Sequence, residues 1–205
     1  MSTSRREIHP IEWQSYRIMR SLVDLSHLPP LSLAVAERVI HASADLEYAE
    51  SLALGEAALE RGREALLNGA PVVCDVGMVA AGITARDAVS YVAGERAREV
   101  AAERGITRSA AGFRVALEAV GEGAVWVVGN APTALYELLE LDAERSLSPA
   151  LVVGLPVGFV GAAESKDALL ASGLPAVANR GVKGGSAVAA AAVNALIYYE
   201  GTEED

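Results

Sequence analysis

The sequence predicts an α/β fold in which a parallel sheet of about five strands is flanked by helices and preceded by an N-terminal helical segment. Short β-branched runs alternate with helical patterns after residue 69, which is typical of a parallel sheet covered on both faces. Before residue 70 the patterns are helical. With 205 residues, 52% of them hydrophobic, the chain can bury the core of one domain. We expect a single domain over 1–205, with a helical part at 1–69 and an α/β part at 70–200.

Three helices are expected in the helical part. The first covers 12–22, where bulky hydrophobic residues recur at a spacing of three. Two prolines then break the chain, and Ser32 is expected to cap a second helix that ends near Ser43. Asp45 is the expected cap of a third helix, which continues to the stop signal at Asn68-Gly69.

Five strands are expected in the α/β part. Each is short and apolar rather than alternating, as in strands that are buried on both faces. They cover 71–79, 88–92, 124–130, 150–158 and 175–181, with helical patterns between them at 94–105, 109–120, 132–144 and 163–173. The apolar run 186–199 is too short to span a bilayer and contains Asn194, so we expect a buried helix there.

The loops that follow the strands are candidates for a ligand site. Open α/β sheets bind ligands in the crevice beyond the carboxyl ends of their strands. The segments expected there are DVGMVAAGIT, VGNAPTA, GLPVGFVGAAES and NRGVKGGSA, all rich in glycine and small residues. Each leads towards a helix N-terminus, whose exposed amides attract anions. Glycines also serve tight turns alone, but four such loops at one edge favour a ligand site.

Charge and missing motifs exclude several classes of function. The formal net charge of −10 argues against binding to nucleic acid, which needs clustered basic residues. The single cysteine, Cys74, allows no disulfide framework and is expected in the core. No zinc-ligand spacing, dinucleotide fingerprint, phosphate-binding loop or nucleophile elbow occurs, so we expect no metal site. The first residues lack the apolar segment of a signal peptide, which favours a cytoplasmic protein with no membrane attachment.

One polar stretch interrupts the apolar helical part. In RVIHASAD, Arg38, His41 and Asp45 stand at i, i+3 and i+7, a spacing that places them on one face of a helix. A solvated polar stripe would explain the same pattern. If Asp45 instead caps the next helix, its carboxylate would lie near the imidazole at a helix junction.

Six segments together carry a resemblance to a known family. They are HPIEWQSYRIM, AERVIHASADLEYA, PVVCDVGMVAAGI, TRSAAGFRVA, VVGNAPTAL and the long block from Leu151 to Leu196, in this order along the chain. They resemble the precorrin-8X methylmutases of the corrin (vitamin B12) pathway, including the cobalt-precorrin-8 enzymes. The resemblance implies a Rossmann-like sheet, a homodimer and the migration of a methyl group from C11 to C12 of the macrocycle. It implies no redox cofactor, since the reaction is an intramolecular [1,5]-sigmatropic shift.

The family's residue roles carry over position by position. The resemblance makes His41 the proton donor and acceptor and makes Ser15 and Arg38 substrate-binding residues. It also implies that Thr84 and Arg114 line the pocket. The implied substrate is a large flat ring with acetate and propionate groups, and guanidinium groups pair with carboxylates in bidentate fashion. Further candidate cations for these groups are Arg17, Arg108, Arg180 and Lys183.

Two other functions are weighed against the isomerase. A non-catalytic corrinoid-binding or carrier protein would have the same fold but would leave its pigment unchanged. A nucleotide-binding α/β enzyme rests on the architecture alone, and the missing phosphate-binding fingerprint argues against it. The sequence carries no residue that indicates a cobalt ligand, so it does not separate the two branches of the pathway.

Overall fold

The five-strand sheet is confirmed, with four parallel strands and one antiparallel strand at its edge. The structure is a computed structural model that describes residues 9–201. The strands lie in the order β1-β5-β4-β3-β2. The parallel strands are β2 (Val72–Cys74), β3 (Val125–Val128), β4 (Leu151–Gly154) and β5 (Ala176–Asn179), and β1 (Leu52–Leu54) runs antiparallel to β5.

The fifth strand is not the one that the sequence predicts. Residues 88–92 contribute only an isolated bridge between Val73 and Val89, because the chain turns away at Tyr91, whose carbonyl accepts from the Gly94 amide. The fifth strand, β1, lies inside the expected third helix. That helix is instead divided into α3 (Tyr48–Ser51) and α4 (Glu56–Leu67). Pairing with the open edge of β5 overrides the helical pattern between them.

The other expected helices are present. They are α1 (Pro10–Leu22), α2 (Pro30–Ser43), α6 (Glu95–Arg104), α7 (Arg108–Val120), α8 (Pro132–Arg145), α9 (Ala162–Ala171) and α10 (Ser186–Tyr198). The strand expected at 71–79 is shorter than predicted, because β2 ends at Cys74 and the short helix α5 (Gly77–Gly82) begins within the expected range. The cap of α2 differs from the expectation. The Glu56 carboxylate accepts the amides of Leu31 and Ser32 at 2.8 and 2.9 Å and also the Ser32 hydroxyl. Ser32 is therefore a donor to this cap rather than the cap itself.

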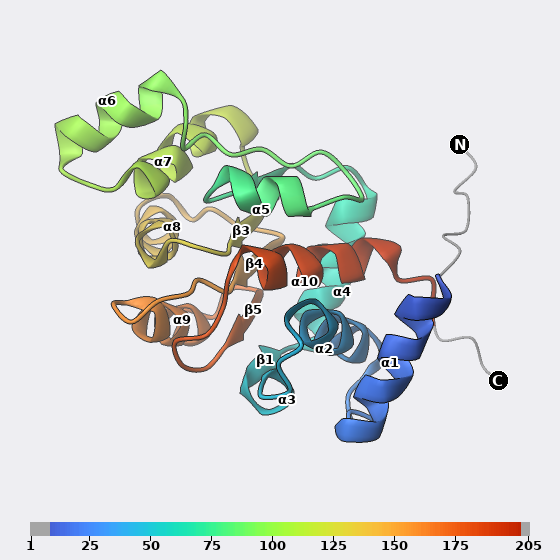
Figure 1. Cartoon of the computed structure of the whole chain (residues 1–205). Helices are drawn as coiled ribbons and strands as arrows, with labels where there is room; N and C mark the ends of the chain where they lie inside the picture. The colour runs from blue at the N-terminus through green and yellow to red at the C-terminus, as the bar shows by residue number, and fades with distance from the viewer. Residues whose placement is uncertain (1–8, 202–205) are drawn as a thin grey trace.

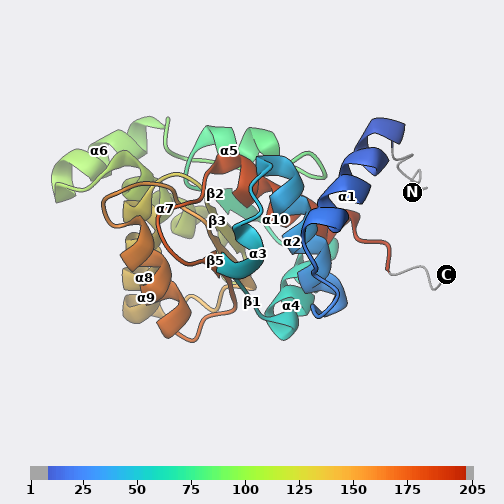
Figure 2. The same cartoon turned by 60° about the horizontal axis from the view of Figure 1, so that its bottom comes forward.

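The sheet lies between two layers of helices (Figures 1 and 2). Because successive strand residues point to opposite faces, Val72 and Cys74 pack towards α2, α4 and α10, while Val73 packs towards α7 and α8. Trp126 of β3 is the largest buried side chain on the α7 and α8 side of the sheet, and its ring meets that of Phe113 edge to face with centroids 4.9 Å apart. The alanine-rich α10 packs closely on its neighbours: a Cβ on Gly82 of α5 would lie 2.8 Å from the Cβ of Ala190.

The parallel strands lie in chain order from β2 to β5, so this part of the sheet lacks the reversal of strand order found in the Rossmann arrangement. Their carboxyl ends still meet at one edge, where the glycine-rich loops gather. Among residues 9–201, each helix is too short or too polar to cross a bilayer.

Candidate active site

Ser15 and His41 are brought into contact by the packing of α1 on α2. The Ser15 Oγ lies 3.1 Å from Nδ1 of His41. The Tyr16 ring stacks on the imidazole, with ring centroids 4.7 Å apart and ring planes 9° apart. His41 makes no other hydrogen bond to residues 9–201. Because Nδ1 faces Ser15, Nε2 is the ring nitrogen left to exchange a proton with a bound molecule.

Arg38 lies one helical turn before His41 and joins the same cluster. Its Nη1 donates to Oε1 of Glu12 at 2.6 Å and to the Tyr16 hydroxyl at 3.3 Å. The Arg38 side chain is partly buried, with 23% of its surface exposed. Ser15, Arg38 and His41, which the resemblance groups as site residues, thus form one cluster across α1 and α2.

Helical spacing explains how these side chains meet. Glu12, Ser15 and Tyr16 stand at i, i+3 and i+4 on α1, and Arg38 and His41 stand at i and i+3 on α2, so each set shares one helix face. A bidentate ion pair from Arg20 to the buried Glu37, at 2.5 and 2.8 Å, also ties α1 to α2. The stacked and ion-paired contacts hold the imidazole at this interface.

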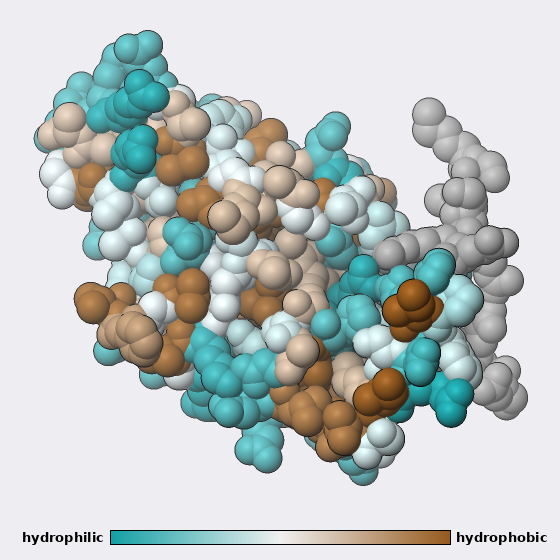
Figure 3. Space-filling view, in the orientation of Figure 1, coloured by the Kyte–Doolittle hydropathy of each residue, from teal (hydrophilic) through white to brown (hydrophobic). Residues whose placement is uncertain are grey.

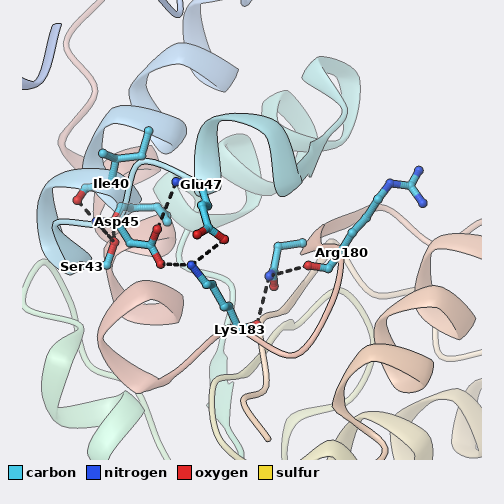
Figure 4. A network of polar contacts seen from close by, with 8 residues as sticks. Ile40, Ser43, Asp45, Glu47, Arg180 and Lys183 are labelled. Carbon is cyan, nitrogen blue, oxygen red and sulfur yellow. Dashed lines mark hydrogen bonds and ion pairs between the residues drawn. The ribbon is translucent and has the colours of Figure 1, made fainter. Parts of the chain in front are cut away.

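Asp45 does not lie beside the imidazole. The helix α2 ends at Ser43, and Ala44 takes a left-handed conformation (φ 53°) that turns the chain away. The Asp45 carboxylate instead accepts from Nζ of Lys183 at 2.6 Å, and Glu47 lies 2.8 Å from the same Nζ. Figure 4 shows Lys183 reaching up from the loop after β5 to both carboxylates. The hydrogen bond to Lys183 lowers the pKa of Asp45.

A shallow hollow of about 320 Å³ lies between the end of α2 and the β5–α10 loop. One side is formed by Ala42, the residue after His41, together with Ser43 and Tyr48. The other side is formed by Val157 and by the glycines that follow Lys183. This hollow is at the small end of the range for small-molecule pockets, about 300–1,000 Å³. It lies where the sequence predicts a ligand site, beyond the carboxyl ends of β4 and β5.

Among residues 9–201, neither Thr84 nor Arg114 contacts Ser15, Arg38 or His41. Thr84 follows α5, where its amide donates to Asn194 of α10 at 3.0 Å. Arg114 lies on α7, in the helix layer on the other side of the sheet. Its guanidinium contacts three carboxylates of α8, those of Glu137, Glu140 and Glu144. The structure therefore brings together three of the five expected site residues.

The amides of the loop just before α8 already have an anionic partner. The buried carboxylate of Asp75, just after β2, accepts the amides of Gly129, Asn130 and Ala131 at 3.1, 2.8 and 2.7 Å. Burial raises the pKa of Asp75, although these amides act in the opposite direction. The expectation that the VGNAPTA loop presents open amides to a ligand is wrong, because the protein's own carboxylate takes that position.

Cys74 lies in the core as expected. It is 1% exposed, and burial raises the pKa of its thiol to about 12. In the part of the chain from residue 9 to residue 201, no three His, Cys, Asp or Glu side chains come together as metal ligands would.

Two members of the cluster were missed by reasoning from the sequence. Tyr16 stacks on the catalytic candidate, and Glu12 holds Arg38. The signal for both is present in HPIEWQSYRIM, since they share the helix face of Ser15. Only the packing of α1 on α2 shows that this face meets His41.

Comparison with known proteins decides the family. The family model described as precorrin-8X methylmutase matches residues 10–199, nearly the whole chain. The chain belongs to the precorrin-8X methylmutase family. The resemblance inferred from the six segments is thereby confirmed, and the chain is an isomerase of the methylmutase type.

Relatives of both named activities are similar to this methylmutase. The cobalt-precorrin-8 methylmutase of Methanothermobacter thermautotrophicus is 40% identical over 96% of this chain and 96% of its own length. The precorrin-8X methylmutase of Pseudomonas aeruginosa is 43% identical over 93% of this chain and 95% of its own. The solved structure of the precorrin-8X methylmutase from Thermus thermophilus superposes with a TM-score of 0.82 at 35% identity and covers 92% of this chain and 96% of that one.

Proposed function

We propose that this methylmutase converts precorrin-8X or cobalt-precorrin-8 by moving a methyl group from C11 to C12 of the macrocycle, giving hydrogenobyrinic acid or cobyrinic acid. The observation that carries this proposal is the cluster in which the Ser15 hydroxyl contacts Nδ1 of His41 and the Tyr16 ring stacks on the imidazole. Relatives with both substrate names match nearly the whole chain at similar identity, so both substrates belong in the test.

His41 is the proposed proton donor and acceptor. Protonating the conjugated ring would polarise it and ease the methyl shift, and the same imidazole would take the proton back afterwards. The reaction therefore has no net gain or loss of a proton. General acid–base catalysis of this kind typically contributes about 10²–10⁴-fold, and the remainder comes from binding the substrate in a reactive shape.

Ser15 and Arg38 are the proposed substrate-binding residues of this cluster. Ser15 orients the imidazole through Nδ1 and can turn its hydroxyl to a ligand. Arg38 donates to Glu12 and can exchange that carboxylate for one of the substrate's acid groups. Thr84 and Arg114 remain proposed pocket residues on the resemblance alone. For Arg114 the substrate would have to compete with Glu137, Glu140 and Glu144.

We also propose that the active unit is a cytoplasmic homodimer, each copy a single domain. Phe159 and Val160, in the loop between β4 and α9, are 93% and 88% exposed. Figure 3 shows hydrophobic side chains exposed in several separate places on the face seen there. Exposed apolar residues at a loop tip favour contact with another protein surface. A hollow of about 320 Å³ is also small for a corrin ring, and a second copy would enlarge it.

The test is a single-turnover experiment with excess protein and each substrate in turn. An isomerase changes the absorption spectrum of the pigment, and the new pigment persists after denaturation. A carrier protein would release the original pigment unchanged, and that outcome would refute the proposed function.

A further inference from the structure

Lys166 is a buried lysine that the proposed proton transfer does not use. It lies on α9 with 0% of its surface exposed, and burial lowers its pKa to about 8. Its Nζ donates to Oδ1 of Asn179 at 3.0 Å and to the carbonyl oxygen of Lys183 at 2.5 Å. A buried ammonium is tolerated only where acceptors replace water, and these two do so.

Asn179 extends this contact into the loop 180–185, which joins β5 to α10. Its side chain is fully buried, and Nδ2 donates to the carbonyl oxygens of Arg180 and Lys183 at 3.2 and 3.0 Å. The Lys183 carbonyl thus accepts from both buried side chains. Lys166 and Asn179 therefore fix the backbone at the point from which the Lys183 side chain leaves the loop.

The residues that follow β4 contact the loop on its inner side. The Gly185 amide donates to the Leu155 carbonyl at 2.9 Å. Gly184 has no room for a side chain, because a Cβ there would collide with the carbonyl oxygens of Leu155 and Pro156. The loop is therefore held between the carboxyl end of β4 and the side chains of α9 and β5.

On its outer side the loop faces the end of α2. Lys183 crosses to Asp45 and Glu47 (Figure 4), and Lys183, Asp45 and the residue after His41 all line the hollow described above. The position of Lys183 thus depends on a buried contact, while its charge lies in the hollow next to the helix that carries His41.

We propose that Lys166, acting with Asn179, is a positioning residue of this methylmutase: it holds the loop 180–185 so that Lys183 forms the wall of the substrate hollow opposite α2. The inference rests on the proposed function, because it assigns this hollow to the substrate. Lys166 contacts neither His41 nor the hollow, so its loss should weaken binding and leave the chemical step unchanged.

The test is a double-mutant cycle with Lys166→Met and Lys183→Met, since methionine is an unbranched side chain only one atom shorter than lysine and lacks the donors. The dissociation constant of the product pigment is measured by absorbance titration, and the single-turnover rate is measured at saturation. Each single variant should weaken binding about tenfold. The double variant should bind within about twofold of either single one, because both changes remove the same wall. The saturated rate should stay within about twofold of wild type.

Leu138→Ala is the matched control, because it opens a cavity in the core on the other side of the sheet and should leave binding unchanged. A measurement without ligand tests the positioning role of Lys166 separately from the proposed function. In the protein without pigment, Lys166→Met should speed hydrogen exchange at the Gly185 amide, and Lys183→Met should not.

Additive losses of affinity, or unchanged binding in Lys166→Met, would overturn the positioning role, as would unchanged exchange at Gly185. A wild-type protein that binds neither pigment would refute the proposed function instead. If Lys166→Met fails to fold, Asn179→Asp replaces it. This variant keeps the acceptor for Lys166, removes the donor to both loop carbonyls, and should weaken binding to a similar degree.

Discussion

The Oγ of Ser15 lies 3.1 Å from Nδ1 of His41, and this contact links the orientation of the imidazole to a neighbouring helix. We predict that Ser15→Ala lowers the single-turnover rate about 10- to 100-fold, since small misplacements of a catalytic group have effects of this size. The measurement is the absorbance change at saturating protein. Ser21→Ala is the control, because its hydroxyl donates only to the Ile18 carbonyl on the exposed side of α1. Equal rates in Ser15→Ala and wild type would show that the contact does not orient His41.

Phe159 is the most exposed large hydrophobic residue among residues 9–201, with 93% of its surface accessible. If the loop that carries it lies in a dimer interface, Phe159→Asp should place a charge there and shift the protein from dimer to monomer. Sedimentation velocity at micromolar concentration measures the change. Val89→Asp, at a residue 43% exposed beside the edge strand β2 rather than in the loop between β4 and α9, is the control and should leave the dimer intact. A wild-type protein that sediments as a monomer would contradict the proposal directly.

Cys74 should be unreactive in the folded protein. Burial raises the pKa of its thiol to about 12, so at pH 8 only about 10⁻⁴ of it is the reactive thiolate, and the side chain is 1% exposed. We expect a thiol reagent such as Ellman's reagent to react with less than a tenth of the protein in an hour. The same protein in 6 M guanidinium should react within a minute. Rapid reaction without denaturant would show that β2 is not buried as described.

Lys166 should make stability depend on pH. The lysine loses its proton near pH 8 in the folded protein, whereas in the unfolded chain it keeps the proton up to about pH 10.5. Between these values the unfolded state binds more protons, so the free energy of unfolding gains a positive slope with pH. We expect the free energy of unfolding of wild type to rise relative to that of Lys166→Met by about 1–3 kcal/mol between pH 7.5 and 9.5. Urea unfolding measures it, and a constant difference would place the lysine in contact with water.

Most of the sheet could be predicted because its strands are buried on both faces and leave continuous apolar runs. The edge strand β1 could not. Leu52–Leu54 lie inside a pattern that favours a helix, and only their pairing with Asn179, Ala178 and Val177 of β5 makes them a strand. The run at 88–92 has the composition of a strand but forms one bridge, since the chain turns at Tyr91. Local composition does not determine long-range pairing at a sheet edge.

As with the sheet, only the part of the site that depends on local sequence could be predicted. Helical spacing places Arg38 and His41 together, but the left-handed Ala44 that directs Asp45 to Lys183 is invisible in the sequence. The three carboxylates around Arg114 come from α8, and the Asp75 carboxylate reaches amides some 54 residues along the chain. Each of these contacts joins segments whose proximity depends on the fold.

In the proposed reaction, His41 transfers the proton that allows the methyl group to migrate. The most direct measurement compares pigment binding and single-turnover conversion in wild type and His41→Ala. We predict that His41→Ala binds the pigment with a dissociation constant within about threefold of wild type and converts it at least about 10²-fold more slowly, the lower limit for the loss of a general acid–base. Conversion by His41→Ala at the wild-type rate would contradict the claim.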